Sequence, residues 1–263
     1  MKNYLIFLAL CLIFLLQSCS LYKSGKEVKI AIHSPTNQIS VNNFAEWLKK
    51  EESEIEIVEL KNYEENAATE VIAGVDGVIF VDNDSYMNYD TNLYDEIKLQ
   101  EIENAQKFST NILSIAIEKN LPILAIKSNI PIMKHFSKVN QNIYLNKTDS
   151  TDEKWLVFKK SSYLATNTKL DLVLMKTDKS FHFNDIANEF ESNIIDESDN
   201  VYAYSYLNHK TKPYFLSVNW DPAIDENKST LSKYIFLSFV KSSIDYYDRK
   251  QPKKLSSNQY YML

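Results

Sequence analysis

The chain has 263 residues, 44% of them hydrophobic, and a formal net charge of -6 with a pI near 5.4. An acidic chain without a basic cluster has no electrostatic support for nucleic-acid binding, so we expect no nucleic-acid partner. Both of its cysteines lie within the first 19 residues. The remaining length must therefore fold on a hydrophobic core, without disulfides, cysteine zinc sites or a thiol nucleophile.

The N-terminus has the pattern of an export signal. Lys2 precedes an apolar run at 4–16, which is shorter than the roughly 20 residues of a transmembrane helix, so residues 1–18 are predicted to be a signal peptide. The run ends in LQSC at 16–19, which resembles a bacterial lipobox. That resemblance implies cleavage before Cys19 and attachment of membrane lipid to its thiol. A plain secretory signal with an incidental cysteine is the alternative.

The rest of the chain reads as one domain behind a tether. Residues 19–27 are short and polar and form the predicted lipidated tether, residues 28–248 the domain, and residues 249–263 a polar C-terminal tail. The predicted location is the bacterial cell envelope, with the protein lipid-anchored to a membrane and facing the periplasm. Whether that membrane is the inner or the outer one stays open.

Strand and helix patterns alternate through the first half of the domain. Strands are predicted at 28–32, 55–60, 77–81 and 122–126, and helices at 41–50, 67–73 and 96–119. The runs at 77–81 and 122–126 are almost continuously apolar, as in strands buried on both faces of a parallel sheet. This order predicts a doubly wound parallel sheet, whose ligands bind beyond the carboxyl ends of the strands.

The second half changes character. Short strand patterns separated by polar turns occur at 155–158, 170–175, 201–207 and 214–218, and an amphipathic helix is predicted at 231–246. The predicted fold class is therefore α/β: a doubly wound, mostly parallel sheet flanked by helices, with extra antiparallel strands in the C-terminal half.

Four segments, in order, resemble motifs of the class I glutamine amidotransferase-like superfamily, closest to the gamma-glutamyl hydrolases of the peptidase C26 group. VDGVIF at 75–80 is similar to the DGLLL strand, and LPILAIKSN at 121–129 to the LPILGICRG turn that presents the catalytic cysteine. KSFHFNDI at 179–186 is similar to NSFHHQAI, and SVNWDPA at 217–223 to GVQWHPE, which carries the catalytic histidine and glutamate. The resemblance implies the fold of this superfamily.

The same alignment of motifs implies that the catalytic residues are replaced. Lys127, Asp221 and Ala223 stand where the family has its cysteine, histidine and glutamate. No catalytic residue is therefore predicted. The expected pocket is lined by Asp82, Asn83, Lys127, Ser128, His182, Asn219 and Asp221.

Three alternatives concern the side chains of this pocket. Lys127 and Asp221 either form an ion pair that lines the pocket or both point into solvent. His182 either contacts a ligand at the rim or is a strand residue with one hydrogen bond. The tyrosine-containing stretch at 84–90 follows a strand end and either contacts a ligand or packs on its own domain.

The sequence predicts neither a metal site nor a cofactor, because the histidines lack metal-ligand spacing. Two functions follow. The first is a membrane-anchored lipoprotein with a catalytically degenerate amidotransferase-like domain that binds an unknown small ligand or protein partner. The second is a hydrolase that cleaves gamma-glutamyl or related amide bonds through non-standard residues.

Overall fold

The computed structural model describes residues 27–35, 38–51, 55–60, 65–81, 96–136, 146–147, 153–176, 181–182, 186–223 and 229–251. The predicted signal peptide, Cys19, the pocket residues Asp82 and Asn83, and the stretch at 84–90 lie outside these ranges. Among the described helices, none has the length and apolar character needed to cross a membrane.

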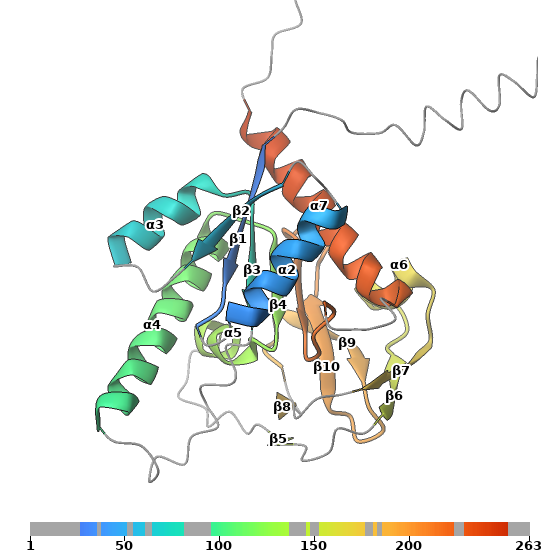
Figure 1. Ribbon diagram of the computed structural model, residues 1–263. Helices are drawn as coiled ribbons and strands as arrows, with labels where there is room; N and C mark the ends of the chain where they lie inside the picture. Colours follow the sequence, from blue (N-terminus) through green and yellow to red (C-terminus); the bar gives the residue numbers. More distant parts are fainter. Residues whose placement is uncertain are drawn as a thin grey trace, which may run out of the picture.

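A nine-stranded sheet forms the centre of the molecule, in the order β2-β1-β3-β4-β11-β10-β9-β6-β7 (Figure 1). The five strands from β2 to β11 are parallel, and the remaining pairs are antiparallel. The bounds are β1 Val28–His33, β2 Ile55–Leu60, β3 Gly77–Val81, β4 Ile123–Ile126, β6 Glu153–Phe158, β7 Leu172–Lys176, β9 Phe190–Ile195, β10 Val201–Tyr206 and β11 Phe215–Val218. The predicted fold class is confirmed.

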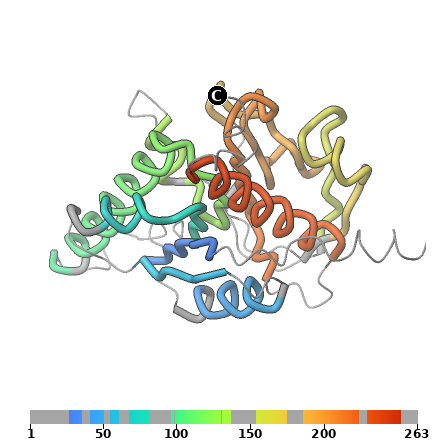
Figure 2. Tube along the Cα trace, turned by 90° about the horizontal axis from the view of Figure 1, so that it is seen from above, coloured from blue at the N-terminus to red at the C-terminus, as the bar shows by residue number. Residues whose placement is uncertain are grey.

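Helices cover both faces of the parallel half (Figures 1 and 2). Its central strands β3, β4 and β11 are therefore buried throughout. One face packs against α2 (Gln38–Glu51) and α7 (Thr230–Lys250), where Trp47 stacks on Phe236 at 3.6 Å between ring centroids. The other face packs against α3 (Glu65–Gly74), α4 (Glu96–Glu118) and α5 (Asn129–Phe136). These two cores make the domain doubly wound.

The start of β3 joins three elements at the amino edge of the sheet. The buried carboxylate of Asp76 accepts hydrogen bonds from the Lys29 amide and from the Lys250 ammonium at the end of α7, both at 2.9 Å. Gly77 follows, and a Cβ there would lie 2.3 Å from Ser243 Oγ of α7. Gly77 therefore lets α7 approach β3 closely, and Asp76 holds the C-terminal end of α7.

The structure also contains elements that the sequence patterns did not predict. These are α5, the short helix α6 (Tyr163–Thr168), strand β9, and a two-stranded sheet of β5 (Asn146–Lys147) and β8 (Phe181–His182). Strand β9 escapes the pattern because Asn193 is polar yet buried: its side-chain carbonyl accepts from the Leu164 amide at 2.8 Å, and its amide donates to Ser205 Oγ at 2.9 Å. The α6 helix is thereby fastened to β9.

Candidate functional site

A sharp turn at residues 126–128, here called the elbow, connects β4 to α5. Lys127, at its centre, has a φ of 48°, in the left-handed region that non-glycine residues rarely adopt. Its backbone amide donates to the Val218 carbonyl at 2.9 Å, so the neighbouring strand β11 holds the turn. The Ser128 hydroxyl is buried and donates to the Ile126 carbonyl at 2.9 Å. The elbow is therefore a fixed feature at the carboxyl end of the sheet.

The register of the sheet brings four predicted pocket residues to one edge. Strands β4 and β11 are parallel neighbours, with Ile126 opposite Val218, so Lys127 and Ser128 leave β4 where Asn219 leaves β11. Asp221 follows two residues later and, like Lys127, is half-buried. Because β3 ends in the same register, this edge is the carboxyl edge of the parallel strands, beyond which ligands bind in doubly wound sheets.

A buried network of amide side chains lies beneath the elbow. Asn129 donates to the Asn219 side-chain carbonyl, Ser217 Oγ donates to Asn129 Oδ1 at 3.1 Å, and Asn219 Nδ2 donates to the Val201 carbonyl at 3.0 Å. These bonds connect the start of α5 with β11 and β10. Asn219 therefore positions the strands under the site. Asn129 and Ser217 were not singled out by sequence, and the signal for them was a polar residue within an apolar strand-turn segment.

Asp221 makes a local bond in the turn that follows β11. Its Oδ1 accepts a hydrogen bond from the Ala223 amide at 2.9 Å, so the two residues that stand for the family's histidine and glutamate are joined to each other. This bond orients the Asp221 carboxylate. The Lys127–Asp221 ion pair stays a prediction.

His182 lies in the small β5–β8 sheet, opposite Asn146. Figure 1 places this sheet at the bottom of the view, on the side of the carboxyl ends of the parallel strands. The His182 backbone is therefore on the side of the elbow. Its side chain is outside the described residues, so its role at a pocket rim stays a prediction.

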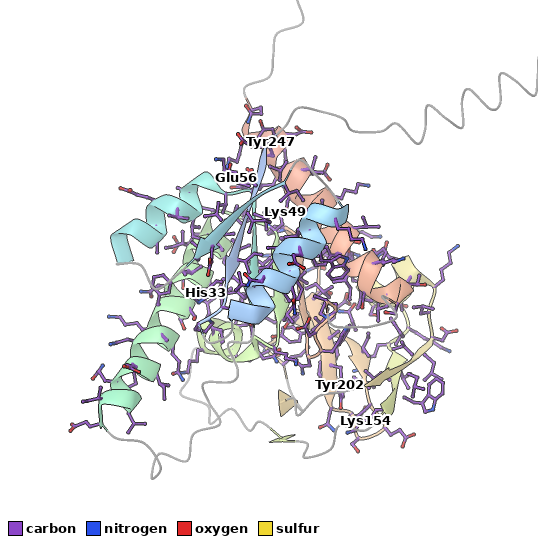
Figure 3. The ribbon with its side chains drawn as sticks, viewed as in Figure 1. His33, Lys49, Glu56, Lys154, Tyr202 and Tyr247 are labelled. Atoms are coloured by element: carbon purple, nitrogen blue, oxygen red, sulfur yellow. The ribbon has the colours of Figure 1, made fainter. Side chains whose placement is uncertain are left out.

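A second charged cluster lies at the start of β10. The buried Asp196 carboxylate accepts from the amides of Ser198 and Asn200 at 2.9 and 3.0 Å. Burial raises the pKa of this carboxyl, but the bonds from Asn200 and Ser198 and the nearby Lys154 outweigh it, so the pKa is lowered. Lys154 Nζ lies 3.9 Å from Asp196 Oδ2 and 3.5 Å from the Tyr202 hydroxyl (Figure 3). Sequence patterns did not bring these three side chains together.

His33 is the last residue of β1 and is fully buried at the carboxyl end of the parallel strands (Figure 3). Its Nδ1 donates to the Leu60 carbonyl at 3.2 Å, and its Nε2 lies 2.7 Å from Ser109 Oγ of α4. The rings of Phe80 and Phe108 pack edge-on against the imidazole. Burial lowers the pKa of His33 to about 4, although the Leu60 carbonyl opposes this, so the ring is neutral at pH 7.

In the described part of the chain, no group of three histidine, cysteine or acidic side chains is arranged to hold a metal ion. The chemistry that the described edge offers is therefore that of an amine, a carboxylate and side-chain amides at the ends of β4 and β11.

Comparison with known proteins connects this geometry to a fold. No family model and no curated protein sequence matches the chain. A GMP synthase subunit protein of Thermoplasma acidophilum is similar over 86% of this chain and 99% of its own, with a TM-score of 0.59 and 14% identity. The glutaminase domain of Trypanosoma brucei CTPS with bound acivicin is similar over 83% and 94%, with a TM-score of 0.60 and 12% identity. The chain thus has the class I glutamine amidotransferase-like fold.

Proposed function

We propose that the protein is a membrane-anchored lipoprotein whose amidotransferase-like domain has lost amidase chemistry and serves as a binding or interaction module. The observation that carries this proposal is the elbow: a lysine occupies the strained position after β4 where the resembled family presents its cysteine. Strained backbone persists where the surrounding structure supports it, often at functional sites. The chain has the sharp turn, but a lysine takes the place of the cysteine. This combination favours a site that binds a ligand or partner over one that cleaves amides.

The neighbouring residues support the same proposal. Amide hydrolysis by this family needs a thiolate nucleophile, a histidine base and an acid that orients it. Lys127 offers no thiol, the Asp221 carboxylate is bonded to the Ala223 amide, and Ala223 has no acidic group. The three positions therefore cannot form the acyl-enzyme by the family's route.

The first prediction concerns hydrolysis. The full chain is expected to leave a gamma-glutamyl amide substrate intact, because the nucleophile and its base are absent. The measurement is ammonia or amine release by the purified protein over hours. The variant Lys127→Met serves as the comparison, since it removes the amine and keeps an unbranched side chain that is one atom shorter.

A positive result would favour the alternative hydrolase. Turnover by the natural chain that disappears in Lys127→Met would show that the elbow lysine takes part in chemistry, and would overturn the proposal of a binding module. Turnover that survives in Lys127→Met indicates a contaminating enzyme or another site. A correctly folded protein that is inactive in both forms is the outcome the proposal requires.

The second prediction concerns the anchor. In a bacterial host that lipidates exported proteins, the chain is expected to incorporate labelled fatty acid and to partition with membranes, because LQSC resembles a lipobox and several acyl chains bind a bilayer stably. Cys19→Ser should abolish the label. Cys11→Ser is the matched control and should retain it. Label in the Cys19→Ser chain would contradict the assignment.

The proposed partners are membrane lipid through Cys19 and a small ligand or protein at the elbow. The proposed location is the cell envelope, with the domain facing the periplasm. Exposure of the domain to protease added to spheroplasts, but not to intact cells, would test this orientation.

A further inference from the structure

The antiparallel end of the sheet carries an exposed apolar face. In the antiparallel pair of β6 and β7, which α6 connects and which is called the hairpin below, Trp155 lies directly opposite Leu174 and Val157 directly opposite Leu172. Opposed residues on paired strands point to the same face, so these four side chains form one patch, here called the hairpin face. Their exposed fractions are 53% for Trp155, 44% for Leu174, 40% for Val157 and 47% for Leu172. A contiguous exposed patch of this kind marks an interaction surface.

The other face of the same hairpin is inside the protein. Leu156 and Phe158 of β6 are buried in the same core as Leu164 of α6, and the partly buried Val173 of β7 packs against this core. Helices α3, α4 and α5 contribute the buried side chains of the opposite core, but none of the hairpin-face residues belongs to it. Figure 2 shows the hairpin at the rim of the molecule, away from α3 and α4. The hairpin face is thus a part of the sheet that the described helices leave uncovered.

Strand β7 also leaves its backbone open. It is the last strand of the nine, and within the described residues only β6 pairs with it. An edge strand with free N–H and C=O groups is a template for another strand, and proteins usually protect such edges with charges, proline or a bulge. The stretch from Leu172 to Leu174 contains none of these, and the charged residues Asp171 and Lys176 lie at the two ends of the strand. Within the described residues, the middle of this edge is therefore open to pairing.

Charges around the hairpin indicate what kind of surface it meets. The exposed charged side chains described there are three lysines and three acids: Lys159, Lys160, Lys169, Asp171, Glu197 and Asp199. Lys154 and Asp196 neutralise each other nearby. This balance gives no attraction to a strongly acidic or basic surface. It also means that two copies of the hairpin do not repel, although the whole chain carries a charge of -6.

We infer that the hairpin face and the β7 edge form the interface between two copies of this chain. Antiparallel pairing of β7 with its symmetry mate about Val173 places Leu172 of one copy opposite Leu174 of the other and extends the apolar patch across the two-fold axis. Such an isologous contact satisfies the backbone of both edges at once. The two nine-stranded sheets then form one continuous sheet.

Interface size explains why both features are needed. A standard stable interface buries about 800 Å² per partner, and four half-exposed side chains supply only part of that area. Backbone pairing along β7 must add the rest. A variant that puts a charge on the hairpin face should therefore weaken the dimer strongly, because each change occurs twice and is desolvated in the contact.

The test is sedimentation velocity of the purified full chain in a mild non-ionic detergent, over about 1 to 100 µM. The natural chain is expected to double its mass with rising concentration. Leu174→Lys should raise the dissociation constant at least about tenfold. Leu237→Lys is the matched control, because Leu237 is also exposed, at 55%, but lies on α7. It should leave the dimer unchanged.

Tryptophan fluorescence gives a second readout. Of the three tryptophans, Trp47 and Trp220 are buried and Trp155 is exposed, so acrylamide quenching reports chiefly on the hairpin face. Quenching should fall as the dimer forms and return in Leu174→Lys. A natural chain that stays monomeric throughout overturns the inference. Shielding of Trp155 without a doubling of mass would assign the face to lipid or detergent instead, and a dimer that survives Leu174→Lys would move the interface elsewhere.

Discussion

Gly77→Ala is expected to lower the free energy of unfolding by about 1–3 kcal/mol, the usual cost of overpacking a core. The new Cβ would meet Ser243 Oγ at 2.3 Å and Phe239 Cζ at 3.0 Å, so α7 must move away from β3. That movement also disturbs the bond between Lys250 and Asp76 at the end of α7. The measurement is urea unfolding followed by circular dichroism, with the midpoint and slope compared with those of the natural chain.

Gly74→Ala is the matched control for this change. A Cβ at Gly74 meets nothing within 4 Å, so the substitution should be neutral or stabilise α3 by up to about 1 kcal/mol. Ser243→Ala added to Gly77→Ala should restore part of the lost stability, because it removes the closest atom. Equal costs for Gly77→Ala and Gly74→Ala would show that the close approach of α7 is not the cause.

Acid is expected to destabilise the protein through His33. The pKa of this buried imidazole is about 4 in the folded chain and about 6.5 in the unfolded chain, so between these values the unfolded state binds a proton that the native state does not. Stability from this group is complete above about pH 6.5 and falls as the pH approaches 4. The difference corresponds to about 3 kcal/mol.

The measurement is the free energy of unfolding at several pH values between 7.5 and 4 for the natural chain and for His33→Gln. The variant will be less stable at neutral pH, because Leu60 and Ser109 lose a packed partner, but its stability should fall less steeply with acid. His135→Gln is the comparison, because His135 is only partly buried on α5. Burial lowers the pKa of His135, although the nearby Glu118 opposes this. Parallel pH curves for the natural chain and His33→Gln would refute the assignment.

The elbow gives the site its functional interest. Left-handed backbone at Lys127 is costly without glycine, and the buried Asn129–Asn219 pair and the β11 carbonyl hold it in place. The resemblance of LPILAIKSN at 121–129 to a family motif predicted where the turn would be, and the register of β4 and β11 brings Asn219 and Asp221 to the same edge. Loss of the network should therefore loosen the elbow before it unfolds the domain.

Much of the fold could be predicted from local pattern. Strands β2 and β3 have the predicted bounds, and the runs that became β3 and β4 were recognised because parallel strands buried on both faces are almost continuously apolar. The runs that became β1 and β11 were predicted as short strands. Strand β11 was grouped with the C-terminal half, where extra antiparallel strands were expected, but it pairs parallel with β4. The long helices α2, α4 and α7 were recognised from their amphipathic spacing, although α7 continues to Lys250, beyond the predicted end at 246. Signals of this kind are contained within a few consecutive residues.

By itself, the sequence determined the layer order of the parallel half, the lysine after β4 and the absence of a thiol from the domain. Only the tertiary structure decided the left-handed conformation of Lys127, the contact of Asn129 with Asn219 across 90 residues, and the open face of the β6–β7 hairpin. The physical reason is range. Propensity and periodicity act between neighbours in the chain, whereas buried hydrogen bonds and uncovered edges depend on which strands pair.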